Sequence, residues 1–170
     1  MFEFIVEDGT GKEDSTSFAT VELADEFITT FYSLEDPWFD LTTPEKELKL
    51  IIATRFINSI IRWESKIVKE EQSLAWPRRQ FRDAEGRLIK SDTIPDIVVS
   101  STVEVARESV TGNLDERPVF LESQDFGDTR EVYAGTHRDG GNDVVFNVRL
   151  NLMRAGYGSS NGTIVNVVRA

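Results

Sequence analysis

"SLAWPRRQFRDAEGRLIKSDTIP", residues 73–95, stands between two segments with helical periodicity and decides how the chain between them folds. It combines a Trp-Pro pair, a turn-like Asp-Ala-Glu-Gly sequence and a second proline at its end. Residues 78–90 hold five bases and only two acids. The stretch is therefore either a structural connector or a cationic surface for a partner.

A β-hairpin is the interpretation that we favour for this stretch. Leu74 and Trp76 would alternate towards the core, residues 83–86 would form the turn, and Leu88 would return on the inward face. Gly86 suits the turn because glycine adopts a positive φ at low cost. The structural residues of this prediction are Trp76, as a core plug, with Pro77, Gly86 and Pro95.

A nucleic-acid surface is the alternative. Trp76 and Phe81 are interleaved with arginines, and such aromatic rings can stack nucleobases while the cations follow the phosphates. In the hairpin interpretation the arginines are exposed and meet a partner or a neighbouring subunit. The candidate interface arginines are Arg78, Arg79, Arg82 and Arg87.

The first predicted helix covers about residues 21–32 and follows Thr20. Its apolar face consists of Leu23, Ala24, Phe27, Ile28 and Phe31, which recur at helical spacing.

The second helix is predicted from Thr43, which can cap it, with Pro44 in the first helical position. It runs to about Lys66. Its apolar stripe recurs every four residues at Leu48, Ile52, Phe56 and Ile60.

The third helix begins at Pro95 and stops at Gly112. Its buried stripe is predicted to consist of Val98, Val99, Thr102, Val103, Ala106 and Val110.

Beyond Gly112 the chain is polar and extended up to about residue 143. Residues 144–155 fit a strand or a helix by periodicity, and "GTIVNVVRA", residues 162–170, suits a terminal strand. The predicted fold is mainly α: a small helical bundle of three main helices and one short helix. A β-hairpin is inserted at about 74–90, and an extended carboxy-terminal arm ends in a β-strand. We expect a core domain at 1–112 and an arm at 113–170.

Several function classes find no support in the composition. The chain has no cysteine and a single histidine, His137, and it lacks a nucleophile-elbow sequence. The "DGTGK" run at residues 8–12 does not match the phosphate-loop spacing, and the acidic clusters fit no calcium loop. We expect no enzymatic activity, no cofactor and no metal site. The sequence also shows no signal peptide or membrane span, which predicts a soluble protein.

The negative charge lies at the amino-terminal end. The chain carries a formal net charge of −11, and residues 1–47 alone contain thirteen acids and two lysines. Proteins that bind nucleic acids strongly use a basic face, because neutralising phosphates releases counterions. The charge therefore disfavours general DNA binding.

Several motifs in order resemble the DnaT-like family of phage proteins. They are "VEDGTGKEDSTSFATVELADEFI" at the front, "EKELKLIIATRFINSI", "AWPR", "DAEGRL", "SDTIPDIVVSSTVEVA" and the closing "GTIVNVVRA". The resemblance covers about residues 4–111 and the last strand, and it favours a short helix for 146–155. The family carries the name of a single-stranded-DNA-binding protein, but in phage genomes its members also resemble head–tail connector adaptors.

The resemblance to head–tail connector adaptors implies a virion structural protein without catalytic activity. It implies a ring of probably twelve subunits, bound to the portal and to the next tail or neck protein, with DNA only in transit and no membrane contact. The protein would reside in the virion neck, and in the host cytoplasm during assembly. Strand addition by the arm would use Ile164, Val165, Val167 and Val168. The alternative is a single-stranded-DNA-binding accessory protein of phage replication, whose binding would depend on Arg78, Arg79 and Arg82.

Overall fold

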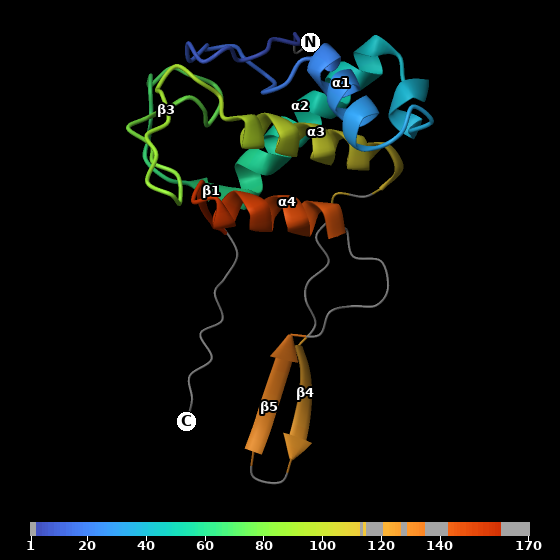
Figure 1. The fold of residues 1–170 in the computed structure, drawn as a ribbon, viewed down its shortest axis with the longest axis vertical. Helices are drawn as coiled ribbons and strands as arrows, with labels where there is room; N and C mark the ends of the chain where they lie inside the picture. Colours follow the sequence, from blue (N-terminus) through green and yellow to red (C-terminus); the bar gives the residue numbers. More distant parts are fainter. Residues whose placement is uncertain (1–2, 113, 115–120, 127–128, 135–142, 161–170) are drawn as a thin grey trace.

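Four α-helices and six short strands form the described part of the chain, which in this computed structural model comprises residues 3–112, 114, 121–126, 129–134 and 143–160 (Figure 1). The helices are α1 (Val21–Phe31), α2 (Thr43–Ile60), α3 (Asp96–Thr111) and α4 (Asp143–Arg154), with a 3-10 turn η1 (Pro37–Asp40). The strands are β1 (Ile61–Trp63), β2 (Lys66–Ile67), β3 (Arg78–Arg79), β4 (Leu121–Phe126), β5 (Thr129–Ala134) and β6 (Gly158–Ser160). The predicted mainly α class with a small β-hairpin is confirmed.

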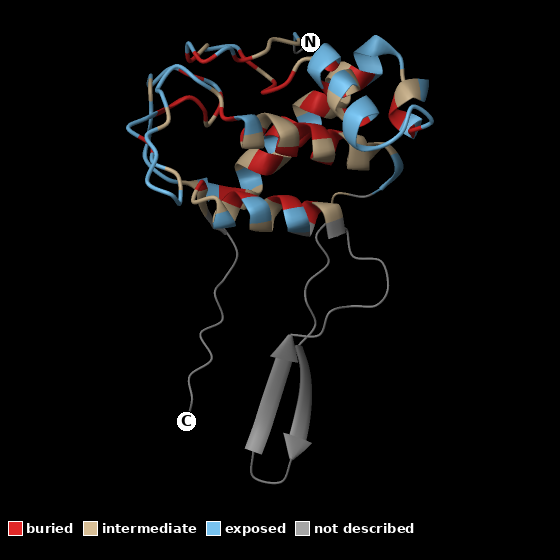
Figure 2. Ribbon diagram, viewed as in Figure 1, coloured by how far each residue is buried: buried red, intermediate tan, exposed pale blue. Residues whose placement is uncertain are grey.

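Helix α3 is the centre of the core. It contacts α1, α2 and α4 (Figure 1), and its Val98, Val103, Val105 and Ala106 are almost completely buried. Figure 2 shows that the buried residues of the helices gather where the helices face one another. The core also includes Ile28 of α1, Leu50 and Ile57 of α2, and Val148 and Leu152 of α4.

Side-chain hydrogen bonds define the starts of α1 and α2. The hydroxyl of Thr20 accepts from the Leu23 N–H at 3.1 Å, as the cap of α1. At α2 the cap is Thr42 and not the predicted Thr43, because the Glu45 carboxylate accepts from the Thr42 N–H at 2.8 Å and fixes the helix one residue earlier. Pro95 begins α3 and Gly112 ends it, as predicted.

The second helix is shorter than predicted. It ends at Ile60 and not near Lys66, because the chain leaves the helix to form β1, which pairs antiparallel with β6. Ile61 lies opposite Ser160 in this pairing. Pairing with β6, which lies near the carboxy-terminal end of the sequence, overrides the local helical pattern after Ile60.

The predicted apolar faces of α1 and α2 are partly wrong. On α1, Ala24 and Ile28 are buried, but Leu23 is 47% exposed and Phe31 is 67% exposed. On α2, the buried residues are Lys46, Leu50, Ala53, Thr54 and Ile57, whereas Leu48 and Ile52 of the predicted stripe are exposed. Both helices carry two adjacent apolar faces, and periodicity alone does not select the one that is buried.

A buried glutamate organises the amino-terminal loop. The carboxylate of Glu7 accepts from the N–H groups of Gly9 and Gly11 at 3.0 and 2.9 Å and from the Lys12 N–H at 2.8 Å. These backbone donors are the ones that a phosphate loop would offer to its ligand. The protein's own carboxylate uses them, which agrees with a structural loop.

The carboxy-terminal third contains a helix and a hairpin. Residues 143–154 form α4, which resolves the ambiguity between helix and strand in favour of the helix. Strands β4 and β5 form an antiparallel hairpin with Leu121 opposite Ala134 and Phe126 opposite Thr129, where the sequence predicted only extended chain. Ile164, Val165, Val167 and Val168 lie outside the described residues, as does His137. The domain boundary at residue 112 stays a prediction.

Candidate nucleic-acid interface

We call the segment between α2 and α3, residues 61–95, the connector. Aromatic side chains fix it to the core. The Trp76 ring is 0% exposed and packs edge-on against Trp63 and Phe81, with ring centroids 5.9 and 5.1 Å apart. Tyr157, which follows α4, contacts both Trp76 and Phe81 and completes the cluster. Trp76 is therefore a core residue, and its ring is not available to stack on a nucleobase. Pro77, joined to Trp76 by a cis peptide bond, is buried beside it.

The predicted hairpin at 74–90 is largely wrong, because only one β-bridge joins its two sides. Arg82 lies opposite Leu88, while β3 pairs with β2 and not with a returning strand. Leu88 is 58% exposed and does not return to the core as predicted. The turn between them is held by the Asp83 carboxylate, which accepts from the N–H groups of Glu85 and Arg87 at 3.0 and 2.9 Å. Gly86 lies in this turn with φ +79°.

Arg78 is a structural residue. Its guanidinium donates to the backbone carbonyls of Glu64, Ala75 and Ser65 at 2.5, 2.8 and 2.5 Å. Burial lowers the pKa of Arg78, and the nearby Glu64 raises it. With 8% of its surface exposed, Arg78 joins residues 64–65 to its own segment, residues 75–78, and offers little to a ligand.

The other three candidate arginines are exposed but not equivalent. Arg79 donates to the Val68 carbonyl through Nε at 2.8 Å and through Nη2. Arg82 donates to the Gly86 carbonyl at 2.7 Å. Arg87 forms ion pairs with Asp83 and Glu85, both at 2.8 Å, so its charge is compensated locally.

An open groove of about 760 Å³ lies along β2, β3 and the residues that follow β2. Its lining contains four bases and two acids: Lys66, Lys69, Arg78 and Arg79 against Glu70 and Glu71, with Ile67 and Val68 between them. Lys66, Lys69 and Arg79 are exposed. We call this feature the basic groove.

Lys66 and Lys69 were not among the predicted interface residues, because Lys66 was expected at the end of the second helix and Lys69 in the charged stretch that follows it. The signal that could have indicated them is the charge of residues 61–90. This segment holds eight bases and five acids, whereas the rest of the chain is strongly acidic.

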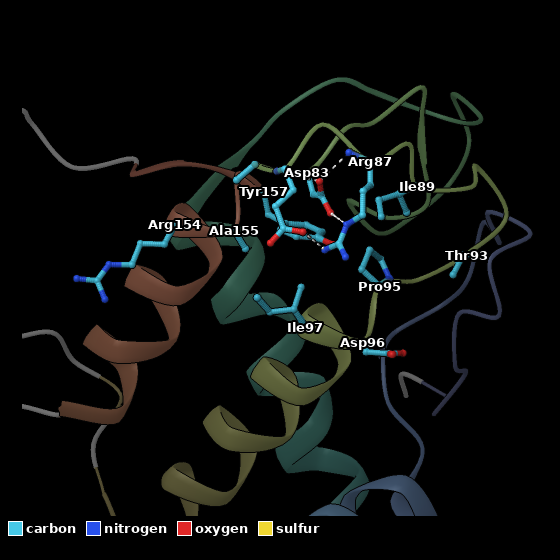
Figure 3. Close-up of a pocket in the computed structure, with 12 residues that line it drawn as sticks. Asp83, Arg87, Ile89, Thr93, Pro95, Asp96, Ile97, Arg154, Ala155 and Tyr157 are labelled. Carbon is cyan, nitrogen blue, oxygen red and sulfur yellow. Dashed lines mark hydrogen bonds and ion pairs between the residues drawn. The ribbon is translucent and has the colours of Figure 1, made fainter.

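A second cavity, of about 440 Å³, opens beside the turn, between the connector, the start of α3 and the end of α4 (Figure 3). Figure 3 shows the paired Asp83 and Arg87 at its edge, with Tyr157 behind them, while Arg154 points away. Its lining has three acids and two bases, and Arg87 is neutralised. This cavity is less suited to a phosphate than the basic groove. Among the described residues no cluster of acids or histidines is arranged to hold a metal ion, and no described helix is long and apolar enough to cross a bilayer.

Comparison with known proteins identifies the family. The model of the family described as "Putative DnaT-like ssDNA binding protein" matches residues 2–170. No curated protein and no solved structure matches the chain. The match conflicts with the predicted head–tail connector, with its ring of twelve subunits and with its portal and tail partners, so those predictions are wrong. The prediction that DNA only passes through the protein as cargo is wrong for the same reason.

The error has a physical origin. The head–tail interpretation gave the acidic residues 1–47 more weight than the small basic loop at 78–90, although residues 61–90 together carry eight bases and five acids. Local charge at the groove, and not the net charge of the molecule, determines whether a phosphate backbone can approach. With nearly its entire length matched, the chain belongs to the DnaT-like ssDNA-binding protein family.

Proposed function

We propose that this protein binds single-stranded DNA in the basic groove and acts as an accessory factor in DNA replication, without catalysing a reaction. The observation that carries the proposal is the exposed cluster of Lys66, Lys69 and Arg79 around an open groove. This cluster lies in the net-positive connector of an otherwise acidic chain. The family match supports single-stranded DNA as the ligand. The virion-neck location stays a prediction, since neither the fold nor the family bears on it.

The groove predicts how the DNA would be held. Its lining contains two lysines, two arginines, two glutamates and two aliphatic side chains but no aromatic ring, and the Trp76 ring is buried. Base stacking, which contributes about 1–3 kcal/mol per base in aromatic-rich sites, is therefore unavailable there. Binding rests on phosphate contacts, so it is tolerant of sequence and strongly dependent on salt.

Fluorescence anisotropy with a labelled oligodeoxythymidylate of about 20 nucleotides tests the proposal. The double variant Lys66→Gln/Lys69→Gln should bind about tenfold more weakly than the wild type at low salt, because two phosphate contacts are lost. The matched control is Arg55→Gln/Lys90→Gln, which removes the same charge from exposed residues outside the groove lining. It should change the affinity at most about twofold. Equal weakening by both variants, or no binding by the wild type at low salt, would contradict the proposal.

A further inference from the structure

Helix α1 carries an apolar stripe that the described part of the chain leaves open. Leu23, Phe27 and Phe31 recur every four residues, beside the face that α1 buries in the core, and the middle residue, Phe27, is itself half-buried against that core. Leu23 is 47% exposed and Phe31 is 67% exposed. The stripe continues into the following turn with Tyr32 and Leu34, which are 41% and 72% exposed. We call these five residues the α1 stripe.

The stripe is ordered by its own contacts. The rings of Phe27 and Phe31 lie 4.7 Å apart, and those of Phe27 and Tyr32 lie 6.4 Å apart. The Arg107 guanidinium lies 4.0 Å from the centre of the Tyr32 ring and forms an ion pair with Asp36 at 2.6 Å. One end of the stripe is thereby fixed before any partner arrives, which lowers the entropic cost of binding.

The surroundings of the stripe are acidic. From Glu13 to Glu45 the sequence contains nine carboxylates and no lysine or arginine. Two of the nine are paired with bases from elsewhere in the chain, Asp25 with Lys46 and Asp36 with Arg107. Glu22 and Glu26 are exposed and precede Leu23 and Phe27 by one residue, so they lie along one flank of the stripe. Glu35 is exposed at its far end. Such a surface repels DNA and anionic lipid alike.

We propose that the α1 stripe is a docking site for a protein partner that presents a basic amphipathic helix. An apolar stripe with spacing of four residues fits the apolar face of a second helix. Lysines or arginines beside that face would meet Glu22, Glu26 and Glu35. Contiguous exposed apolar surface of this kind marks interaction sites in soluble proteins. The site is separate from the basic groove, and the proposal does not depend on DNA binding.

The experiment uses the full chain and a labelled synthetic helix of about 18 residues, built from leucine and lysine with an amphipathic pattern. Two further peptides serve as controls: a scrambled sequence of the same composition, and a version with glutamate in place of lysine. We expect the leucine–lysine helix to bind at least about tenfold more tightly than either, since it alone combines both complementary features.

Two variants and one control locate the binding. Leu23→Ser/Phe31→Ser should lower the affinity for the leucine–lysine peptide about tenfold. Glu22→Gln/Glu26→Gln should also lower this affinity and make the binding less dependent on salt. Leu88→Ser removes a side chain of similar exposure from the connector and should leave binding unchanged. Oligodeoxythymidylate affinity should not fall in any of the three variants.

Four outcomes would overturn the proposal. The first is equal binding of the scrambled peptide, and the second is full binding by the Leu23→Ser/Phe31→Ser variant. The third is loss of DNA binding in that variant, which would assign the stripe to DNA. The fourth is self-association in sedimentation velocity that the same variant abolishes, which would make the stripe a contact between copies of this chain.

Discussion

Trp76 shows how one side chain decides between two interpretations of the connector. Its indole ring is fully buried among Trp63, Phe81 and Tyr157, and its Nε1 has no hydrogen-bond partner among the described residues. Trp76→Ala should therefore lower the free energy of unfolding by about 3–5 kcal/mol, the range for deleting a large buried aromatic side chain. Urea denaturation measures this. Phe31→Ala, at a ring that is 67% exposed, should cost less than about 1 kcal/mol, and equal losses would contradict the assignment of Trp76 to the core.

Arg78 differs from the arginine next to it. Replacing Arg78 with glutamine leaves the carbonyls of Glu64, Ser65 and Ala75 without their donors, and the expected loss of stability is about 3 kcal/mol. Arg79→Gln changes an exposed side chain and should cost less than about 1 kcal/mol. Both variants lose one positive charge. A difference between their stabilities in thermal and urea unfolding therefore reports the lost hydrogen bonds of Arg78 and not the lost charge. If Arg78→Gln were as stable as Arg79→Gln, the buried role of Arg78 would be wrong.

Glu104 gives the fold a dependence on pH. Burial raises its pKa above the usual value, so the ionised form opposes folding. The favourable contribution is complete below the unfolded pKa, about 4.3, and is lost as the pH rises through the folded pKa. Glu104→Gln should therefore have a higher Tm than the wild type at pH 7. The difference should disappear at a pH below about 4.

Calorimetry of both proteins across this pH range checks the sign for Glu104. Glu26→Gln, which removes an exposed glutamate from α1, controls for the change in net charge. A Glu104→Gln variant that is less stable than the wild type at neutral pH would show that the carboxylate has a favourable partner.

The amino-terminal loop supports the connector as a unit. Ser73 donates to the Lys12 carbonyl through its N–H at 3.0 Å and to the Ser15 carbonyl through its hydroxyl at 2.6 Å. The shape of the loop depends on Glu7, whose two carboxylate oxygens each accept two hydrogen bonds. The middle of the connector is thereby attached to the loop that Glu7 shapes.

Glu7→Gln should destabilise this loop. The amide NH₂ would face the N–H groups of Gly9 and Gly11 in one placement and the N–H of Lys12 in the other, and the expected cost is about 2–3 kcal/mol. Amide hydrogen exchange should accelerate at residues 9–12 and near Ser73, more than in α3. Glu13→Gln, which changes an exposed carboxylate in the same loop, provides the control. Unchanged exchange in the Glu7 variant would contradict the role of Glu7.

Local signals predicted the elements that depend on local chemistry. Thr20, Pro95 and Gly112 mark helix ends in the sequence and in the structure alike. The end of α2 was not predictable in this way, since it depends on Ile61 pairing with Ser160 from the far end of the chain. The buried faces of α1 and α2 depend on which neighbour packs against them, and two adjacent apolar faces look equally suitable in a helical pattern.

The candidate site was predicted only in part, for the same reason. The basic connector was recognised from composition, but the burial of Arg78 depends on carbonyls contributed by Glu64 and Ser65, which lie more than ten residues earlier. Lys66 and Lys69 join Arg79 only because β2 pairs with β3. The groove is thus a product of tertiary contacts, which charge counts along the sequence cannot supply.

At the scale of the whole molecule, opposite charges are separated along the chain. Residues 1–60 contain thirteen acids and four bases, whereas residues 61–90 contain eight bases and five acids. In the proposed function a DNA strand would therefore be attracted to residues 61–90 and repelled from residues 1–60. This separation limits the number of phosphates that the protein can contact at once.

The salt dependence of DNA binding measures that number. If Lys66, Lys69 and Arg79 each neutralise one phosphate, log Kobs should fall with log salt concentration with a slope of about −2, since single strands contribute about −0.7 per contact. Lys66→Gln/Lys69→Gln should reduce the slope to about −0.7, while Arg55→Gln/Lys90→Gln should leave it near −2. Anisotropy titrations at a series of salt concentrations give these slopes. A wild-type slope much steeper than −2 would require phosphate contacts beyond the basic groove, and a slope near zero would exclude binding through phosphates, because counterion release is inseparable from such contacts.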